Sequence, residues 1–292
     1  MSDLVGARIV AVHAHPDDEA LTTGGTLAHL STRGAEVTVV TCTLGEQGEV
    51  IGEPYQGLVR TDQLGGFRIS ELSASLQSLG VRGEFLGGAA CWRDSGMLGD
   101  PANDRPGAFI HSGEAAVHQL KEVFDRLRPH LVITYGPDGG YGHPDHVRAH
   151  HITHAAVEGS SVQRILWAVT GADDLTRGLA AIAEIPPTWR RADDEIARHE
   201  TVDLRIALDD AAYAAKVRAY EAHATQLWVA NGSVSTVNPQ AAFARTSDVD
   251  AAPMVYALSN LIAQPLMRYE HYQFGWGTPF TAGQCPMEGL SW

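Results

Sequence analysis

Two short clusters of histidine and acidic residues stand far apart in the chain. The first is His15-Pro16-Asp17-Asp18-Glu19, and the second is His143-Pro144-Asp145-His146. Imidazole nitrogens and carboxylate oxygens bind zinc readily, and a catalytic zinc site typically has three protein ligands with one position left for water. Together the two clusters can supply such a ligand set, so they predict a metallohydrolase.

The two clusters also share a local pattern. Each has a histidine followed by proline, with another possible ligand three residues after the histidine. Proline fixes its own φ and biases the preceding residue towards extended backbone, so both turns are preset. A single histidine beside a strand is more often structural than a ligand, but two matching clusters favour a metal site. The spacing alone does not say which of Asp17 and Asp18 is the ligand.

The elements predicted around these clusters alternate between strands and helices. Apolar and β-branched runs predict strands at 8–12, 36–43, 84–86, 131–135, 165–169 and 202–208. Helical spacing predicts helices at 20–33, 63–79, 114–127, 145–157, 173–184 and 210–224. A long loop is expected at 87–106 and a glycine-rich loop at 136–143. Each cluster therefore follows a predicted strand.

This alternation predicts an α/β fold with a Rossmann-like, mostly parallel twisted sheet and helices on both faces. Ligands of such folds bind beyond the carboxyl ends of the strands, where both clusters should meet. Proline, glycine and aromatic residues after Leu227 predict a smaller, irregular or β-containing C-terminal region that covers the site. We expect a single catalytic unit, with a Rossmann-like core at 1–170 and the remainder of the core plus the covering region at 171–292.

Composition narrows the class of partner. Hydrophobic residues make up 44% of the chain, yet no stretch approaches the roughly 20 apolar residues that span a bilayer. The N-terminus lacks a signal-type segment, so the cytoplasm is the expected location. Three widely spaced cysteines argue against a disulfide framework, and a net charge of −14 argues against nucleic acid as a partner. We expect a small-molecule substrate and no membrane partner, and the oligomeric state stays open.

The segments 14–19 and 142–146 resemble the signatures of the zinc-dependent PIG-L/LmbE-like de-N-acetylases. The likeness extends through 41–50, 62–72, 92–97 and 223–226, and is greatest to the branch that deacetylates N-acetylglucosaminyl-inositol in mycothiol biosynthesis. It implies hydrolysis of the acetamide of 1-D-myo-inositol 2-acetamido-2-deoxy-α-D-glucopyranoside to the free amine and acetate. The residues after Gln226 match the family less closely.

The resemblance also implies the roles of the residues that would hold and surround a metal. His15, Asp18 and His146 correspond to the ligands of Zn²⁺, and Asp17 corresponds to the general base that accepts a proton from the attacking water. Fe²⁺ or another divalent ion accepts similar ligands, so the native metal is left open.

Three further residues are assigned catalytic roles. His143 could stabilise the tetrahedral intermediate or protonate the departing amine, and Asp145 could orient the His143 imidazole. Tyr141 resembles the family tyrosine that polarises the substrate carbonyl, although packing in the loop is the plain alternative.

The roles of several other residues are predicted on less evidence. Arg68 and Asp94 match family positions that bind substrate hydroxyls, with surface salt bridges as the alternative. His13 faces the same way as His15 by strand alternation, and a supporting or packing role is favoured over coordination. The segment 223–226 is similar to the family, but its chemistry cannot be derived from the sequence.

Three other functions stay open at this point. A mycothiol S-conjugate amidase would use the same metal chemistry on a bulkier amide, and the segments 43–50 and 65–68 favour the deacetylase over it. An iron oxygenase with two histidines and one carboxylate is the second, and a non-catalytic sugar- or nucleotide-binding module is the third. Neither of these two explains Asp17 and His143 together. No Gly-x-Gly-x-x-Gly pattern follows the first predicted strand, which argues against dinucleotide binding.

Overall fold

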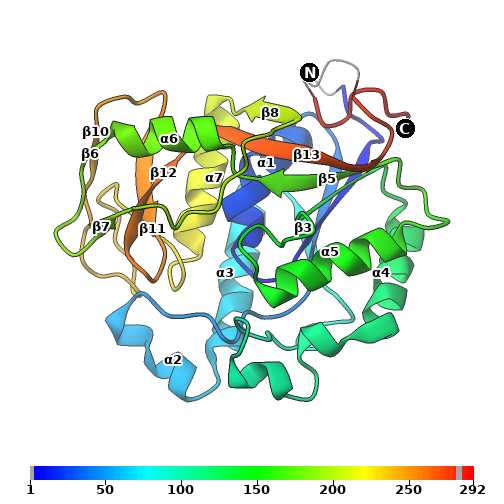
Figure 1. Cartoon of the computed structure of the whole chain (residues 1–292), viewed down its shortest axis with the longest axis horizontal. Helices are drawn as coiled ribbons and strands as arrows, with labels where there is room; N and C mark the ends of the chain where they lie inside the picture. Colours follow the sequence, from blue (N-terminus) through cyan, green and yellow to red (C-terminus); the bar gives the residue numbers. More distant parts are fainter. Residues whose placement is uncertain (1–2, 281–284) are drawn as a thin grey trace.

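A seven-stranded sheet forms the centre of the protein in the computed structural model, which describes residues 3–280 and 285–292 (Figure 1). The strand order is β3-β2-β1-β4-β5-β13-β8. These strands are β1 (Arg8–His13), β2 (Glu36–Thr41), β3 (Arg82–Phe85), β4 (Leu131–Thr134), β5 (Arg164–Val169), β8 (Leu204–Ala207) and β13 (Tyr269–Gly277). From β3 to β5 all neighbours are parallel, whereas β13 is antiparallel to both β5 and β8. The predicted mostly parallel sheet is confirmed.

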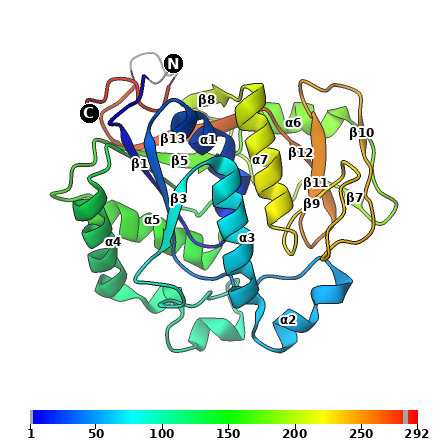
Figure 2. The same ribbon diagram turned by 180° about the vertical axis from the view of Figure 1, so that it is seen from behind.

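Helices cover both faces of this sheet, as the two opposite views show (Figures 1 and 2). The α-helices are α1 (Gly24–Thr32), α2 (Gly57–Arg60), α3 (Leu64–Leu79), α4 (Gly113–Leu127), α5 (Pro144–Ala156), α6 (Ala172–Ala181) and α7 (Asp210–Ala222). A π-helix, η1 (Glu19–Thr23), leads into α1, and short 3-10 turns lie at Glu53–Tyr55, Pro101–Asp104 and Phe109–His111. Helices α1, α3 and α7 pack together on one face, and α4 packs against α5 on the other. The predicted two-sided α/β architecture is confirmed.

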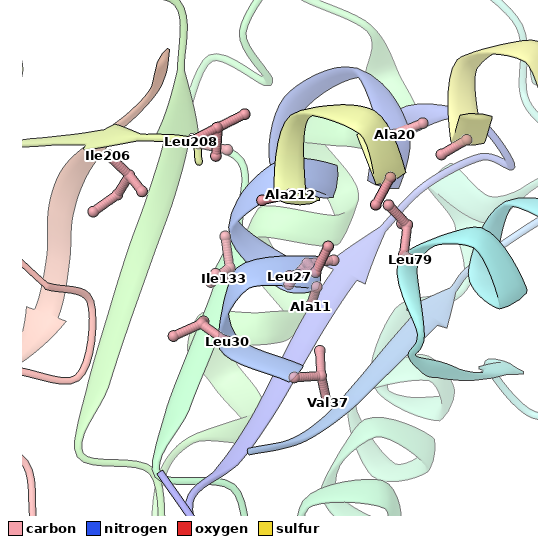
Figure 3. Close-up of a cluster of buried hydrophobic side chains, with 14 of the residues drawn as sticks. Ala11, Ala20, Leu27, Leu30, Val37, Leu79, Ile133, Ile206, Leu208 and Ala212 are labelled. Carbon is pink, nitrogen blue, oxygen red and sulfur yellow. The ribbon is translucent and has the colours of Figure 1, made fainter. Parts of the chain in front are cut away.

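The side chains of the central strands divide between two cores because successive residues of a strand point to opposite faces. On β1, Ala11 belongs to the core beneath α1 and α7, and Val12 belongs to the core beneath α4 and α5. Figure 3 shows Leu27 of α1 and Ala212 of α7 in the first of these clusters, together with Ile133 of β4. Burial on both faces accounts for the near-continuous apolar runs of these strands.

One predicted helix boundary is wrong. The sequence predicts a helix over 173–184, but α6 ends at Ala181 and the next three residues form strand β6 (Ile182–Glu184). This strand pairs antiparallel with β10 (Arg245–Thr246), which lies far along the chain. The partner is supplied by tertiary structure, so the local pattern of apolar residues does not reveal it.

The residues after α6 both complete the main sheet and build a smaller one. Four strands form the second sheet, in the order β7 (Arg190–Arg191), β12 (Ile262–Leu266), β11 (Met254–Ala257) and β9 (Trp228–Val229). It lies beside α6 and α7 (Figure 1). The chain then returns as β13 between β5 and β8. The predicted β-containing C-terminal region is therefore present, and its role in covering the site stays a prediction.

Two further observations concern the helices and the cysteines. Within the described ranges, no helix combines the length and the apolar character needed to cross a membrane. Cys42, Cys91 and Cys285 are free cysteines.

Candidate active site

The two histidine clusters meet at the carboxyl ends of β1 and β4, which are neighbours in the sheet. The first cluster begins two residues after β1 ends at His13. The second opens α5, where His143 is the N-cap and Pro144 is the first helical residue. Proline suits this position because its fixed φ fits a helix and its missing N–H would have had no partner there. His15 and His146 are thereby brought into direct contact.

Three donor groups form a compact set around one point. His15 Nδ1 lies 3.3 Å from His146 Nε2. Asp18 Oδ2 lies 3.4 Å from His15 Nδ1, and Asp18 Oδ1 lies 3.4 Å from His146 Nε2. Ligands held at about 2.0–2.2 Å from a tetrahedral zinc ion stand roughly 3.3–3.6 Å apart. All three side chains are buried. The predicted ligands His15, Asp18 and His146 therefore lie close enough together to share one divalent ion, and their binding of zinc stays a prediction.

The hydrogen bonds of the two imidazoles fix which nitrogen is free for a metal. His146 donates from Nδ1 to the carbonyl of Gly139 at 3.0 Å, which leaves the Nε2 lone pair available. His15 donates from Nε2 towards Asp145 at 3.3 Å, which leaves its Nδ1 available. Carboxylate and carbonyl partners of this kind orient metal-binding histidines and raise their basicity. Both free nitrogens point into the gap shared with Asp18.

Electrostatics also favour a cation at this point. Burial alone would lower the pKa of His15, but the carboxylates of Asp94, Asp145 and Asp18 raise it well above its usual value. Burial would raise the pKa of Asp18, but His146 and His15 hold it well below its usual range. The site thus stabilises positive charge on the His15 imidazole, and a divalent ion at the same place would be stabilised by the same carboxylates.

Asp145 lies against a different imidazole from the one the sequence predicts. Its carboxylate accepts from His15 Nε2 and, at 2.9 Å, from the backbone N–H of Ser95. His143 instead receives the backbone N–H of Asp145 on its Nδ1, at 3.2 Å. The prediction that Asp145 orients His143 is wrong, because the N-cap position turns the His143 ring back onto its own helix.

This N-cap bond determines the proton position on His143. Since Nδ1 accepts a backbone N–H, the proton of the neutral ring is on Nε2. Burial, followed by the nearby His15 and His146, lowers the pKa of His143 to about 3. The imidazole is therefore neutral at pH 7 and offers an Nε2–H donor to the site.

Asp17 occupies an unusual backbone conformation beside the ligand cluster. Its φ is +116°, a value that residues other than glycine seldom adopt and that costs about 1–3 kcal/mol. Its carboxylate lies 3.2 Å from a terminal nitrogen of Arg68, and burial raises its pKa to about 6 in spite of that guanidinium. A carboxylate with this pKa is mostly ionised at pH 7 and is a stronger base than an ordinary aspartate.

Arg68 and Asp94, predicted as substrate contacts, both border this site. Arg68 is only 2% exposed, and its guanidinium donates to the carbonyls of Gly45 and Pro16 beneath the Asp17 turn. Asp94 lies 3.5 Å from His15 Nε2 and accepts the backbone N–H of Gln47 at 3.0 Å. Neither is a surface salt bridge, and a direct contact of either with substrate stays a prediction.

Tyr141 lies at the entrance to the site. Its side chain is 58% exposed, and its ring meets those of His146 and His143 edge-on at 5.0 and 6.0 Å. Gly140 and Gly142 on either side both have positive φ, which permits this loop conformation. Among the described residues, no hydrogen bond occupies the Tyr141 hydroxyl, so it is available to a substrate.

Tyr135 is a component that sequence reasoning misses. Its hydroxyl accepts the N–H of Ala14 at 2.8 Å and donates to Asp18 Oδ2 at 2.6 Å, and its ring stacks on His146 at 4.1 Å. It also meets His13, which bonds Thr23 at 3.0 Å and so has the packing role expected of it. The available signal is the position of Tyr135 directly after β4, at the edge of the sheet where the site must lie.

We expect Tyr135→Phe to weaken zinc binding by about 10–100-fold, as the loss of outer partners of metal ligands commonly does. The substitution keeps the ring on His146 but leaves Asp18 Oδ2 without its hydroxyl donor. Competition with a chromophoric chelator measures the zinc affinity. Tyr213→Phe is the matched control, because that buried hydroxyl donates to Leu266 O, away from the ligand cluster. Equal affinities in the two variants would contradict the role of Tyr135.

Comparison with protein-family models gives a match over residues 10–157, to the family described as PIG-L: GlcNAc-PI de-N-acetylase. That range begins within β1, ends at the residue after α5, and contains both histidine clusters.

Full-length relatives are also similar to the chain. A 1D-myo-inositol 2-acetamido-2-deoxy-alpha-D-glucopyranoside deacetylase of Corynebacterium efficiens is 66% identical, over 100% of this chain and 95% of the relative. The enzyme of the same name from Corynebacterium diphtheriae is 64% identical over 99% of this chain and 100% of its own. That from Mycolicibacterium smegmatis is 45% identical over 97% and 99%.

Two solved structures share the fold at low sequence identity. The deacetylase–teicoplanin complex has a TM-score of 0.51 and 18% identity, over 75% of this chain and 87% of its own. The antimicrobial reagent A40926 pseudoaglycone deacetylase has a TM-score of 0.50 and 21% identity, over 75% and 82%. Both likenesses bear on the α/β architecture alone.

Proposed function

The chain belongs to the PIG-L family of GlcNAc-PI de-N-acetylases, and we propose that it hydrolyses the acetamide of 1-D-myo-inositol 2-acetamido-2-deoxy-α-D-glucopyranoside. The products would be the free amine and acetate, in mycothiol biosynthesis. Relatives at 64–66% identity over almost their whole length carry this name. The structural observation that supports the proposal most directly is the cluster of His15, Asp18 and His146 with Asp17 beside it.

We propose Zn²⁺ as the metal, held by His15 Nδ1, His146 Nε2 and Asp18. When bound, zinc supplies a Lewis acid that polarises a carbonyl and lowers the pKa of a coordinated water towards about 7. Two imidazoles and one carboxylate suit zinc, and Fe²⁺ accepts the same set, so metal analysis of the purified protein decides between them.

Asp17 serves as the general base in this proposal. Its raised pKa of about 6 lets it accept a proton from the attacking water at neutral pH. It can then return that proton to the departing amine, because a carboxyl group with a pKa near the working pH gives and takes protons readily. The contacts with Arg68 and Glu19 hold the turn that carries this carboxylate.

His143 and Tyr141 serve as hydrogen-bond donors to the acetamide oxygen. The neutral His143 ring presents Nε2–H, so of its two predicted roles the stabilisation of the tetrahedral intermediate is favoured over proton donation from an imidazolium. The exposed Tyr141 hydroxyl can approach the same oxygen from the loop. Asp94 is proposed to accept a substrate hydroxyl beside His15, and Arg68 is proposed to bind a substrate hydroxyl from beneath the Asp17 turn.

The test of this function is amine release from the acetylated glucosaminyl-inositol by metal-defined protein, with a mycothiol S-conjugate as the competing substrate. Faster release from the acetylated compound would support the deacetylase. Preference for the conjugate would identify the mycothiol S-conjugate amidase that the sequence leaves open. Membership of a hydrolytic family argues against the iron oxygenase and the non-catalytic binding module.

Tyr141→Phe should lower kcat by up to about 100-fold. A donor on a loop is expected to contribute less to the rate than a donor in a rigid site. The substitution keeps the ring against His146 and removes only the hydroxyl. Zinc content should stay at the wild-type value because the hydroxyl is not one of the proposed ligand groups. Amine release and metal analysis measure both quantities. Wild-type kinetics would assign Tyr141 to loop packing.

A further inference from the structure

A fully buried carboxylate lies directly behind the proposed base. Glu19 is 0% exposed, and its Oε2 accepts the backbone N–H of Asp17 at 3.0 Å. Its Oε1 accepts the hydroxyl of Ser75 at 2.5 Å and bonds His223 Nε2 at 2.6 Å. Glu19 therefore joins the Asp17 turn to α3 and to the end of α7.

Helix α3 presents a stripe of polar side chains to this region. Arg68, Glu71 and Ser75 are three and four residues apart, so they lie on one side of the helix. Arg68 binds the carbonyl of Pro16, and Ser75 binds Glu19. Glu71 accepts from the backbone N–H and the hydroxyl of Thr225, at 2.8 and 2.6 Å. The stripe thus holds both the Asp17 turn and the segment 223–226.

These contacts fix the peptide groups on both sides of Asp17. The carbonyl before it is held by Arg68, its own N–H by Glu19, and its own carbonyl by the N–H groups of Ala20 and Leu21 at 3.0 and 2.9 Å. The φ of +116° is therefore over-determined by its surroundings, as strained backbone at functional sites usually is.

We propose that Glu19, held by His223 and Ser75, is the positioning residue that aims the Asp17 carboxylate for proton transfer. This inference rests on the proposed role of Asp17 as base. Glu19 does not touch the reacting groups, and acts by holding the Asp17 backbone in its strained conformation. In this proposal His223 holds Glu19 in place. His223 is the first residue of the segment 223–226, whose chemistry the sequence does not reveal.

A purely structural role is the competing explanation. A buried carboxylate–imidazole pair costs desolvation energy and is often no more stabilising than well-packed apolar side chains. Glu19 and His223 are both fully buried, so their contribution to stability alone is a poor reason for the pair. Its position on the amide of the base points to the alignment of Asp17 instead.

A double-mutant cycle tests the proposal in the zinc-loaded protein. Glu19→Leu replaces the acceptor of the Asp17 N–H with an apolar side chain of similar size. It should lower kcat by about 10–100-fold, with KM and zinc content unchanged. Glu19→Gln keeps one oxygen that can accept this N–H, and should recover most of the lost rate. In an Asp17→Asn background, Glu19→Leu should change the residual rate by no more than about twofold, because the group through which it acts is gone.

A less disruptive pair of substitutions tests the same proposal if Glu19→Leu fails to fold. Ser75→Ala removes one donor to Glu19, and should give a smaller loss of kcat that again disappears in the Asp17→Asn background. Ser78→Ala is the matched control on the same helix, because the hydrogen bond of its hydroxyl within the described part of the chain is to Ala74 O. Equal losses in the two backgrounds, or zinc loss that accompanies the rate loss, would overturn the positioning role.

A measurement without substrate separates this inference from the proposed function. Hydrogen exchange at the Asp17 amide should be faster in Glu19→Leu than in the wild type, and unchanged in Ser78→Ala. Absence of amine release by the wild type would reject the proposed function, and the exchange rates would still decide the inference. Wild-type exchange at Asp17 in Glu19→Leu would reject the inference, whatever the substrate proves to be.

Discussion

Asp17→Asn should keep stoichiometric zinc and lose deacetylation by about 10²–10⁴-fold, the range that a positioned general base contributes. The amide preserves the size of the side chain but cannot take a proton from water at neutral pH. Zinc should stay because Asp17 is not one of the three proposed ligands, His15, Asp18 and His146, which lie close together without it. Metal analysis of dialysed protein and an amine-release assay test the two halves.

The pH dependence of the wild type should report the same group. Burial raises the pKa of Asp17 to about 6, and only the ionised form accepts a proton, so activity is lost as the pH falls through this pKa. A bound cation lowers the pKa of Asp17 further, which places the acid limb of kcat/KM at or below about 6.

The control for Asp17→Asn is Asp125→Asn, which removes one carboxylate at an exposed position on α4. An unchanged rate in Asp17→Asn would reject Asp17 as the base.

The sequence predicts the part of the site that follows from strand order. His15 and His146 each lie just beyond a buried strand, and parallel neighbours place such positions at one edge of the sheet. The runs around Ala11 and Ile133 predict those strands because burial on both faces demands continuous apolar residues. The meeting of the two clusters could therefore be predicted from the sequence alone.

The contacts between side chains could not be predicted in the same way. Asp145 is two residues from His143 but lies against His15, because the N-cap geometry of α5 decides where each side chain points. Tyr135 and Glu19 act through partners more than a hundred residues away, Asp18 and His223 respectively. Sequence spacing carries no information on such partners unless the packing of the helices is already known.

The path of the C-terminal residues is a further example. Strand β13 enters the main sheet between β5 and β8 and runs against both, although its residues lie about 100 positions after β5. Local patterns identify apolar runs there but not the sheet they join, since pairing partners are chosen by the rest of the fold. The same reason explains why β6 is missed at the end of α6.

Substitution of the proposed metal ligands should have the opposite effect from substitution of Asp17. His146→Ala removes a ligand nitrogen whose tautomer is fixed by the Gly139 carbonyl, and Asp18→Ala removes the only carboxylate of the set. Each should raise the zinc dissociation constant by more than the roughly 100-fold typical of changes outside the ligand shell. His118→Ala, an exposed histidine on α4, should leave zinc affinity unchanged.

Rescue by zinc then separates ligand from base. Excess zinc should restore part of the activity of Asp18→Ala and His146→Ala, because mass action refills a weakened site that still has two ligands. It should not restore Asp17→Asn, where zinc is already bound and the proton acceptor is missing. Asp17 and Asp18 are adjacent and chemically identical, so only their backbone conformations and partners distinguish their proposed roles. Asp18 accepts a hydrogen bond from Tyr135, whereas Asp17 has the strained φ and lies beside Arg68. If Asp17→Asn loses zinc while Asp18→Ala keeps it and stays active, the two roles are reversed, and Tyr135 must then be supporting the base rather than a ligand.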